Sequence, residues 1–308
     1  MMNWFPTPQR TVKALASAAV VVLGLWVMPS LAGDPFRASN PRPIGDKTQA
    51  AFDAIFKEGN YQQAKSYLSQ AEASESNEPL AYAMLASLAY TNQDWPTLNR
   101  YASKTLQTAE QLRQTDPLRG NLYTAVGHFL EGTYNFKKDG AVGALGKLQK
   151  VFQALDEAKK VDPNDPELNL LTGYMDLMLA VNLPFSNPSQ AIERLEKYGA
   201  PSYLAYRGIA VGYRDLKQPS KAMDYVDRAL ALTPGNPDLL YLKAQILVRQ
   251  EKKNESLEFF KKALDKQAQM LKGNVAQITY EQCRVQSSID NVGRDCYAEL
   301  VRIRDKKD

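Results

Sequence analysis

Residues that could carry out chemistry are scarce in this 308-residue chain. It contains a single histidine, His128, so a catalytic triad or a histidine metal site would rest on one side chain. Val126, Phe129 and Leu130 lie near His128 in a helical pattern, which favours a hydrogen-bonded packing histidine over a catalytic one. Neither a Gly-x-Ser-x-Gly motif nor a dinucleotide-binding fingerprint is present. We therefore predict that the chain is not an enzyme.

Two further stretches have the composition of ligand-binding loops without the required spacing. In GAVGALGKL, residues 140–148, Gly140 is one residue too far from Gly146 for a phosphate-binding loop, and Leu148 replaces the hydroxyl that would hold magnesium. In DPNDPE, residues 162–167, carboxylates cluster as in calcium loops, but the central glycine is missing and two prolines interrupt the stretch. We interpret it as a turn in which an Asp or Asn caps the next helix. We predict no metal and no cofactor.

The two cysteines, Cys283 and Cys296, both lie near the C-terminus. In an oxidising compartment, a disulfide between them would close a short loop and add about 3 kcal/mol of stability in the chain-entropy account. We predict this disulfide. The alternative is a pair of buried free thiols that pack as small hydrophobic groups. A metal or redox role is disfavoured because their separation is far from Cys-x-x-Cys.

The elements that would position side chains are helical hairpins. Residues 203–234 contain two amphipathic patterns joined by a short polar turn, with apolar residues at spacings of three and four. The first pattern has Tyr206, Ile209, Ala210 and Tyr213, and the second has Ala222, Val226, Ala229 and Leu230 before Pro234. At an offset of 34 residues, comparable types recur at Leu240, Ala244, Leu247, Ser256, Phe260 and Ala263. Neither helix can bury its apolar face alone, so we expect hairpins that stack on one another.

This spacing resembles the tetratricopeptide repeat (TPR), a helix-turn-helix unit of about 34 residues. The resemblance implies an all-α fold, a right-handed α-solenoid or superhelix of about six TPR-like hairpins. A Gly-rich connection at 137–146, in the third hairpin, is longer than a regular repeat requires. Residues 155–185 and the following GYRDLKQ also look like exported TPR proteins of cyanobacteria. The other hairpins begin near residues 46, 79, 118, 166 and 237.

The two ends of the chain differ from the repeats. Residues 1–32 combine basic Arg10 and Lys13, an apolar stretch from 14 to 28, and small residues at 30 and 32, as is typical of a secretory signal peptide. The alternative is a retained membrane anchor, although the apolar stretch is shorter than the roughly 20 residues of a spanning helix. After the signal peptide we expect a proline-rich linker or strap at 33–45, the solenoid at 46–272, and a capping region at 273–308 with one closing helix.

Charge gives no sign of nucleic-acid binding. Cleavage after Ala32 would remove two basic residues and leave 36 basic against 34 acidic side chains, a formal net charge of +2. Such a balance provides no field that would steer the chain onto nucleic acid. We predict no nucleic-acid partner, and no integral membrane span once the signal peptide is removed.

The resemblance also implies where a partner would bind. In TPR proteins the first helix of each hairpin faces a concave groove. The corresponding positions here are Tyr174, Leu177, Leu204, Arg207, Val211, Arg214, Tyr241, Gln245, Val248 and Arg249. The alternative is that these arginines pair with acids on the same face, such as Asp215 or Glu251. The lysine and asparagine with which some family members hold a chaperone's carboxylate tail are absent at the matching positions.

We therefore expect an exported TPR protein of the periplasm or thylakoid lumen that binds a protein or peptide partner in its groove, as a scaffold, adaptor or assembly factor. The groove would act only by its complementarity to the partner, without a reaction. Arg207, Arg214 and Arg249 would bind an acidic or backbone group of that partner. The alternative is a periplasmic solute- or lipid-binding protein, in which loops around Gly140 and Phe185 cover a cavity between helices. A small ligand would raise the melting temperature, whereas a protein partner would be lost on mutating the groove.

Overall fold

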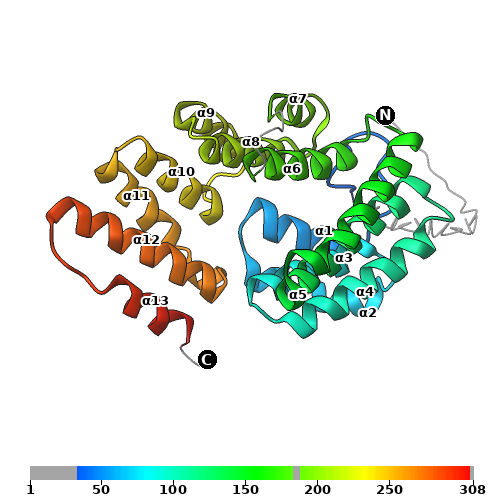
Figure 1. The fold of residues 1–308 in the computed structure, drawn as a ribbon, viewed down its shortest axis with the longest axis horizontal. Helices are drawn as coiled ribbons and strands as arrows, with labels where there is room; N and C mark the ends of the chain where they lie inside the picture. Colours follow the sequence, from blue (N-terminus) through cyan, green and yellow to red (C-terminus); the bar gives the residue numbers. More distant parts are fainter. Residues whose placement is uncertain (1–32, 183–187, 306–308) are drawn as a thin grey trace, which may run out of the picture. The chain divides into compact units, whose positions relative to one another are not determined.

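The computed structural model describes residues 33–182 and 188–305, and the predicted signal peptide lies outside these ranges. The described residues belong to one compact unit. In the described ranges the regular structure is helical, without strands, and consecutive helices pack in pairs (Figure 1). This confirms the predicted all-α solenoid of helical hairpins. Within the same ranges, no helix combines the length and apolar character needed to cross a bilayer.

The first two hairpins begin at the predicted residues. The first pairs α1 (Asp46–Phe52), which continues into the short π-helix η1 (Asp53–Lys57), with α2 (Tyr61–Ser74). The second pairs α3 (Pro79–Thr91) with α4 (Trp95–Leu112). A proline stands in the first turn of both α3 and α4, where its missing N–H costs no intrahelical hydrogen bond.

The third hairpin lies entirely within α5 (Pro117–Val161), whose two halves are separated only at Gly140. Gly140 has φ 70° and ψ −158°, a backbone region that is essentially restricted to glycine. Lys147 of the second half pairs with Glu131 of the first, and Leu155 lies in one core cluster with Leu122. These contacts show that the chain reverses at Gly140. The predicted long connection at 137–146 is therefore wrong, since helix continues on both sides of a single glycine.

The fifth and sixth hairpins follow the predicted register, and the fourth begins at the predicted residue. Small residues between their helices are fully buried, among them Ala210, Ala222 and Ala244. Asp165 accepts the N–H of Leu168 at 2.9 Å and so caps the helix after the DPNDPE turn, as predicted. The hairpins are α6 (Pro166–Asn182) with α7 (Pro188–Tyr198), α8 (Ser202–Asp215) with α9 (Pro219–Leu232), and α10 (Pro237–Arg249) with α11 (Lys253–Leu264).

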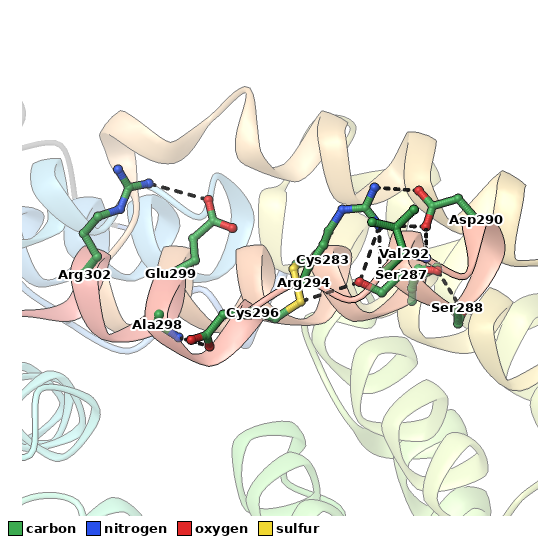
Figure 2. Close-up of a disulfide and its surroundings, with 12 residues drawn as sticks. Cys283, Ser287, Ser288, Asp290, Val292, Arg294, Cys296, Ala298, Glu299 and Arg302 are labelled. Carbon is green, nitrogen blue, oxygen red and sulfur yellow. Dashed lines mark hydrogen bonds and ion pairs between the residues drawn. A yellow bond between two sulfur atoms is a disulfide. The ribbon is translucent and has the colours of Figure 1, made fainter.

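The C-terminal region contains two helices where a single closing helix was predicted. After the 3₁₀ turn η2 (Gln267–Gln269), α12 (Lys272–Asp290) packs against α11, and α13 (Cys296–Arg304) packs against α12. Asn291, in the left-handed conformation with φ 55°, ends α12 and allows the reversal. The predicted disulfide between Cys283 and Cys296 joins the two helices, with Cα atoms 5.6 Å apart (Figure 2).

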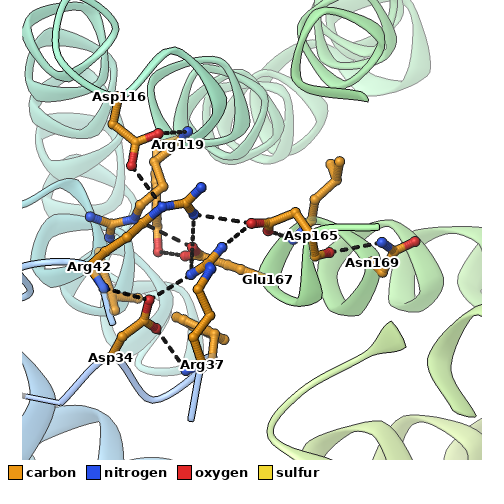
Figure 3. A network of polar contacts seen from close by, with 12 residues as sticks. Asp34, Arg37, Arg42, Asp116, Arg119, Asp165, Glu167 and Asn169 are labelled. Carbon is orange, nitrogen blue, oxygen red and sulfur yellow. Dashed lines mark hydrogen bonds and ion pairs between the residues drawn. The ribbon is translucent and has the colours of Figure 1, made fainter. Parts of the chain in front are cut away.

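Residues 33–45 form a non-helical strap that crosses the starts of several helices. Phe36 packs edge-on against Phe52 of α1, with ring centroids 5.1 Å apart. Asp34 accepts a hydrogen bond from Arg37 at 2.6 Å, and Arg37 also donates to Asp165 before α6. Pairing of this kind is what allows charged groups to be buried. Figure 3 shows the resulting network, which contains Asp34, Arg37, Arg42, Asp116, Arg119, Asp165 and Glu167.

The first hairpin contacts the sixth hairpin as well as the second. The Tyr61 hydroxyl of α2 donates to Asp238 of α10 at 2.5 Å. The side-chain amide of Asn236 donates to the carbonyls of Phe56 and Lys57, each at 3.2 Å. These residues are separated by roughly half the chain, and a solenoid in which each repeat contacts only its neighbours would not bring them together.

Candidate functional site

Three of the predicted groove residues hold α6 against α8. The Tyr174 hydroxyl donates to the carbonyl of Leu204 at 2.7 Å, and its ring occupies the space that Gly208 leaves open. Leu177 is buried against Gly212 in a similar way. Burial raises the pKa of Tyr174 to about 12, so the phenol stays protonated at neutral pH and keeps its hydrogen bond.

Arg207 lies against the first hairpin. Its guanidinium is 3.6 Å from the carboxylate of Asp238, which also accepts the hydrogen bond from Tyr61. Burial raises the pKa of Tyr61, and the nearby Asp238 raises it further. The acidic group that Arg207 contacts in this structure therefore belongs to the chain itself.

The other two predicted arginines, Arg214 and Arg249, line a pocket of about 850 Å³ between α8, α10 and α12. We call it the basic pocket. Gln245 and Val248 of α10 also line it, so four of the predicted residues meet there. Val211 instead packs against the core that α8, α9 and α10 share.

A chain of hydrogen bonds fixes one wall of the basic pocket. The Arg214 guanidinium donates to Asp215 at 2.8 and 2.9 Å and to Gln245 Oε1 at 2.6 Å. Gln245 Nε2 donates to Glu281 at 3.0 Å, and the Tyr241 hydroxyl donates to Glu281 at 2.6 Å. Burial, reinforced by Glu281, raises the pKa of Tyr241. Arg214 thus pairs with Asp215, which is the alternative that the sequence left open.

Cations without an acidic partner surround this wall. Arg249, Lys217 and Arg284 are exposed, and none of them forms an ion pair within residues 33–182 and 188–305. Lys253 also lines the pocket and lies 3.8 Å from Glu251. Basic side chains outnumber acidic ones by five to two in the lining, so the pocket has a positive potential.

Sequence reasoning missed Lys217 and the lining residues that come from α12, and it named Glu251 only as a possible partner of the groove arginines. Lys217 and Glu251 occupy equivalent turns 34 residues apart, with φ values of 60° and 59°. That shared offset is a signal that could have placed them beside the predicted groove positions. Glu281, Arg284 and Val285 come from α12, whose register does not follow from the repeat.

The lining of the basic pocket could hold a ligand through charge and apolar contact. Val248 is partly exposed and provides apolar surface beside the cations, whereas Phe260 and Val285 are buried beneath the lining. His128 is not among the lining residues; its Nδ1 lies 3.4 Å from Glu131, and burial lowers its pKa, so it is a neutral packing histidine. In the part of the chain that the structure describes, no three metal-ligating side chains gather in one place.

Comparison with known proteins identifies repeats in the hairpins that form the pocket. Residues 208–270, from the middle of α8 to the residue after η2, match the tetratricopeptide repeat family. Among solved structures, the chain is similar to PilW, described as a widely conserved type IV pilus biogenesis factor, at 15% sequence identity and a TM-score of 0.45 over 73% of this chain and 92% of PilW. No curated protein matches the chain. Repeats of this kind create binding surfaces, so the family match supports a protein-interaction role.

Proposed function

We propose that the chain is a protein-interaction scaffold that holds an acidic peptide segment of a partner protein in the basic pocket. The observation that carries this proposal is the group of three exposed cations, Lys217, Arg249 and Arg284, that have no acidic partner in the described ranges. A carboxylate that enters the pocket gains charge-assisted hydrogen bonds that the chain does not already make. The mechanism is complementarity without a reaction.

The apolar lining adds a second requirement for the partner. Val248 lies partly exposed beside the cations, so an acidic segment with an apolar side chain buries more surface than a purely acidic one. Arg214 and Gln245 are already held by their own hydrogen bonds and lose little freedom when a peptide binds. A fixed wall and an exposed cationic rim together favour an acidic segment with an apolar anchor.

We further infer that the scaffold is exported and acts as an adaptor or assembly factor in the periplasm or a thylakoid lumen. The disulfide between Cys283 and Cys296 supports this, because such bonds persist in oxidising compartments. The signal-peptide composition of residues 1–32 points the same way.

A charge-reversal experiment tests the proposal. The protein is titrated into fluorescein-labelled peptides of alternating Glu and Leu, with alternating Lys and Leu as the counter-probe, and anisotropy is recorded. We expect the acidic peptide to bind and the basic peptide not to bind. In a variant with Arg249→Glu and Arg284→Glu, affinity for the acidic peptide should fall at least about tenfold, because two attractive charges become repulsive.

The matched control makes the same change at two arginines outside the pocket. Arg100 and Arg302 are mostly exposed, and Arg100→Glu with Arg302→Glu alters the net charge equally. Affinity should stay within about twofold of the unmodified protein, because the new charges are screened from the pocket. Equal losses in both variants, or no binding of the acidic peptide by the unmodified protein, would contradict a specific pocket.

A further inference from the structure

The third hairpin ends in an exposed apolar tip. Phe136, Val142 and Leu145 flank the reversal at Gly140, with 59, 86 and 68% of their surfaces exposed. Every residue from 136 to 142 is exposed. Single exposed apolar residues are common, but three within ten residues around one reversal are a concentration of exposed apolar side chains that points to a partner. We call residues 136–146 the hairpin tip.

Lysines give the hairpin tip and its base a positive charge. Lys137, Lys138 and Lys150 are exposed and form no ion pair in the described ranges, whereas Lys147 is paired with Glu131. With Asp139 included, the charged residues from 131 to 150 sum to +2. An anionic surface would therefore complement this end of the hairpin.

An aromatic pair lies beside the tip. The Lys137 ammonium is 5.4 Å from the ring centroid of Trp95, and Tyr90 meets Trp95 edge-on with centroids 5.8 Å apart. Tyr90 is exposed and Trp95 is half-buried. Tryptophan and tyrosine next to lysine are the side chains that settle at the boundary between lipid headgroups and acyl chains.

We propose that the hairpin tip docks on a membrane surface rich in anionic lipids. Phe136, Val142 and Leu145 enter the boundary of the acyl chains, and the surrounding lysines contact headgroup phosphates. Projecting apolar side chains need a partner that closes around them, and a fluid lipid surface does so without a matching cavity. The docking is interfacial and requires no spanning helix. It is independent of the basic pocket, whose residues belong to other hairpins and to α12.

Vesicle binding tests the proposal. A chain that begins at Gly33 contains every described helix and core cluster of the compact unit and lacks the apolar stretch 14–28, which would itself bind lipid. We expect it to sediment with vesicles of phosphatidylglycerol and phosphatidylcholine in equal parts, and more weakly with phosphatidylcholine alone. Phe136→Ser, Val142→Ser and Leu145→Ser together should lower the partition coefficient at least about tenfold. Lys137→Gln, Lys138→Gln and Lys150→Gln should abolish the preference for the anionic vesicles.

A spectroscopic readout and a matched control separate docking from loss of folding. Trp95 is the only tryptophan after residue 32, so its emission should shift to the blue with anionic vesicles and be quenched by brominated lipids. The control replaces three exposed apolar residues elsewhere, Val161, Leu232 and Tyr297, by serine and should bind as the unmodified chain does. All variants should keep the same circular dichroism, because the replaced side chains are exposed.

Three results would overturn the proposal. In the first, the unmodified chain fails to bind anionic vesicles. In the second, the serine variant of the tip binds them as well as the unmodified chain does. In the third case the chain self-associates without lipid and the tip variant does not, which would assign the patch to a second copy of the chain.

Discussion

The Tyr174 hydroxyl is buried against the carbonyl of Leu204, and this hydrogen bond joins α6 to α8. Tyr174→Phe should lower the free energy of unfolding by about 1 kcal/mol at pH 8, because it removes this buried hydrogen bond between α6 and α8. The pKa of Tyr174 is about 12 in the folded chain, above the usual value near 10 that holds after unfolding. Between these values the unfolded tyrosine ionises first, so the contribution of Tyr174 to stability falls as pH rises.

Urea unfolding at pH 8 and pH 11 measures this prediction. The advantage of the unmodified protein over Tyr174→Phe should shrink or change sign at pH 11, since only the unmodified chain gains phenolate on unfolding at that position. An advantage that stays constant between the two pH values would show that the hydroxyl titrates normally.

At the scale of single residues, the sequence predicted which positions are buried better than it predicted which residues contact one another. Ala210 and Ala222 are fully buried as expected, because repeat register alone decides where small residues lie. Arg207 was expected to meet a ligand, yet its neighbours are Asp238 and Tyr61. Tyr61 precedes Asp238 by 177 residues, and local periodicity carries no information about such a contact.

At the scale of elements, the reversal inside α5 depends on one backbone conformation. Gly140→Ala should destabilise the chain by about 1–3 kcal/mol, because alanine is strained at a φ of 70° and ψ of −158°. The cost is conformational, since no atom lies within 4 Å of a Cβ built at this position. Denaturant unfolding followed by circular dichroism measures it.

Gly146→Ala is the matched control for this prediction. Gly146 is also exposed, lies in α5 and leaves open space around a built Cβ, but its φ is not in the left-handed region. Alanine there should stabilise the helix by up to about 1 kcal/mol, because alanine has the higher helix propensity. Equal effects of the two substitutions would contradict a reversal that is specific to Gly140.

Helix boundaries were predictable where a proline marks the helix start and the following residues also favour a helix. Pro166 and Pro237 open α6 and α10 at the predicted positions. The stretch 137–146 was misread because its glycines suggest a loop, although its alanine, leucine and lysine residues favour helix. The C-terminal cap was read as one helix because Asn291 alone gives little warning of a reversal.

At the scale of the whole chain, the stack of hairpins was predictable and its long-range polar contacts were not. Arg119 and Glu167 lie in the buried network with the strap, with Arg119 Nε 3.4 Å from the Glu167 carboxylate. In the sequence such residues look like ordinary surface charges. Their burial depends on the strap of residues 33–45, which has no repeat pattern to reveal where it packs.

The contact between the first and sixth hairpins should make their stabilities interdependent. In a solenoid with neighbour contacts only, a substitution in α10 would loosen α9, α11 and adjacent helices. Here Asp238→Ala removes the acceptor of Tyr61 and the partner of Arg207. We expect native-state hydrogen exchange to rise in α1, η1 and α2 as well as in α10, because local opening of each hairpin is opposed by the other.

Two further variants separate the effect of losing the long-range contact from any general effect on α10. Tyr61→Phe removes only a hydroxyl from α2 and should raise exchange at the start of α10, since coupling between two sites acts in both directions. Asp227→Ala removes the 2.6 Å ion pair with Lys243, between α9 and α10, and should leave exchange in α2 unchanged. If Asp238→Ala raises exchange only in α9, α10 and α11, the first hairpin is stabilised by its sequence neighbours and the strap, and the long-range contact contributes nothing to its stability.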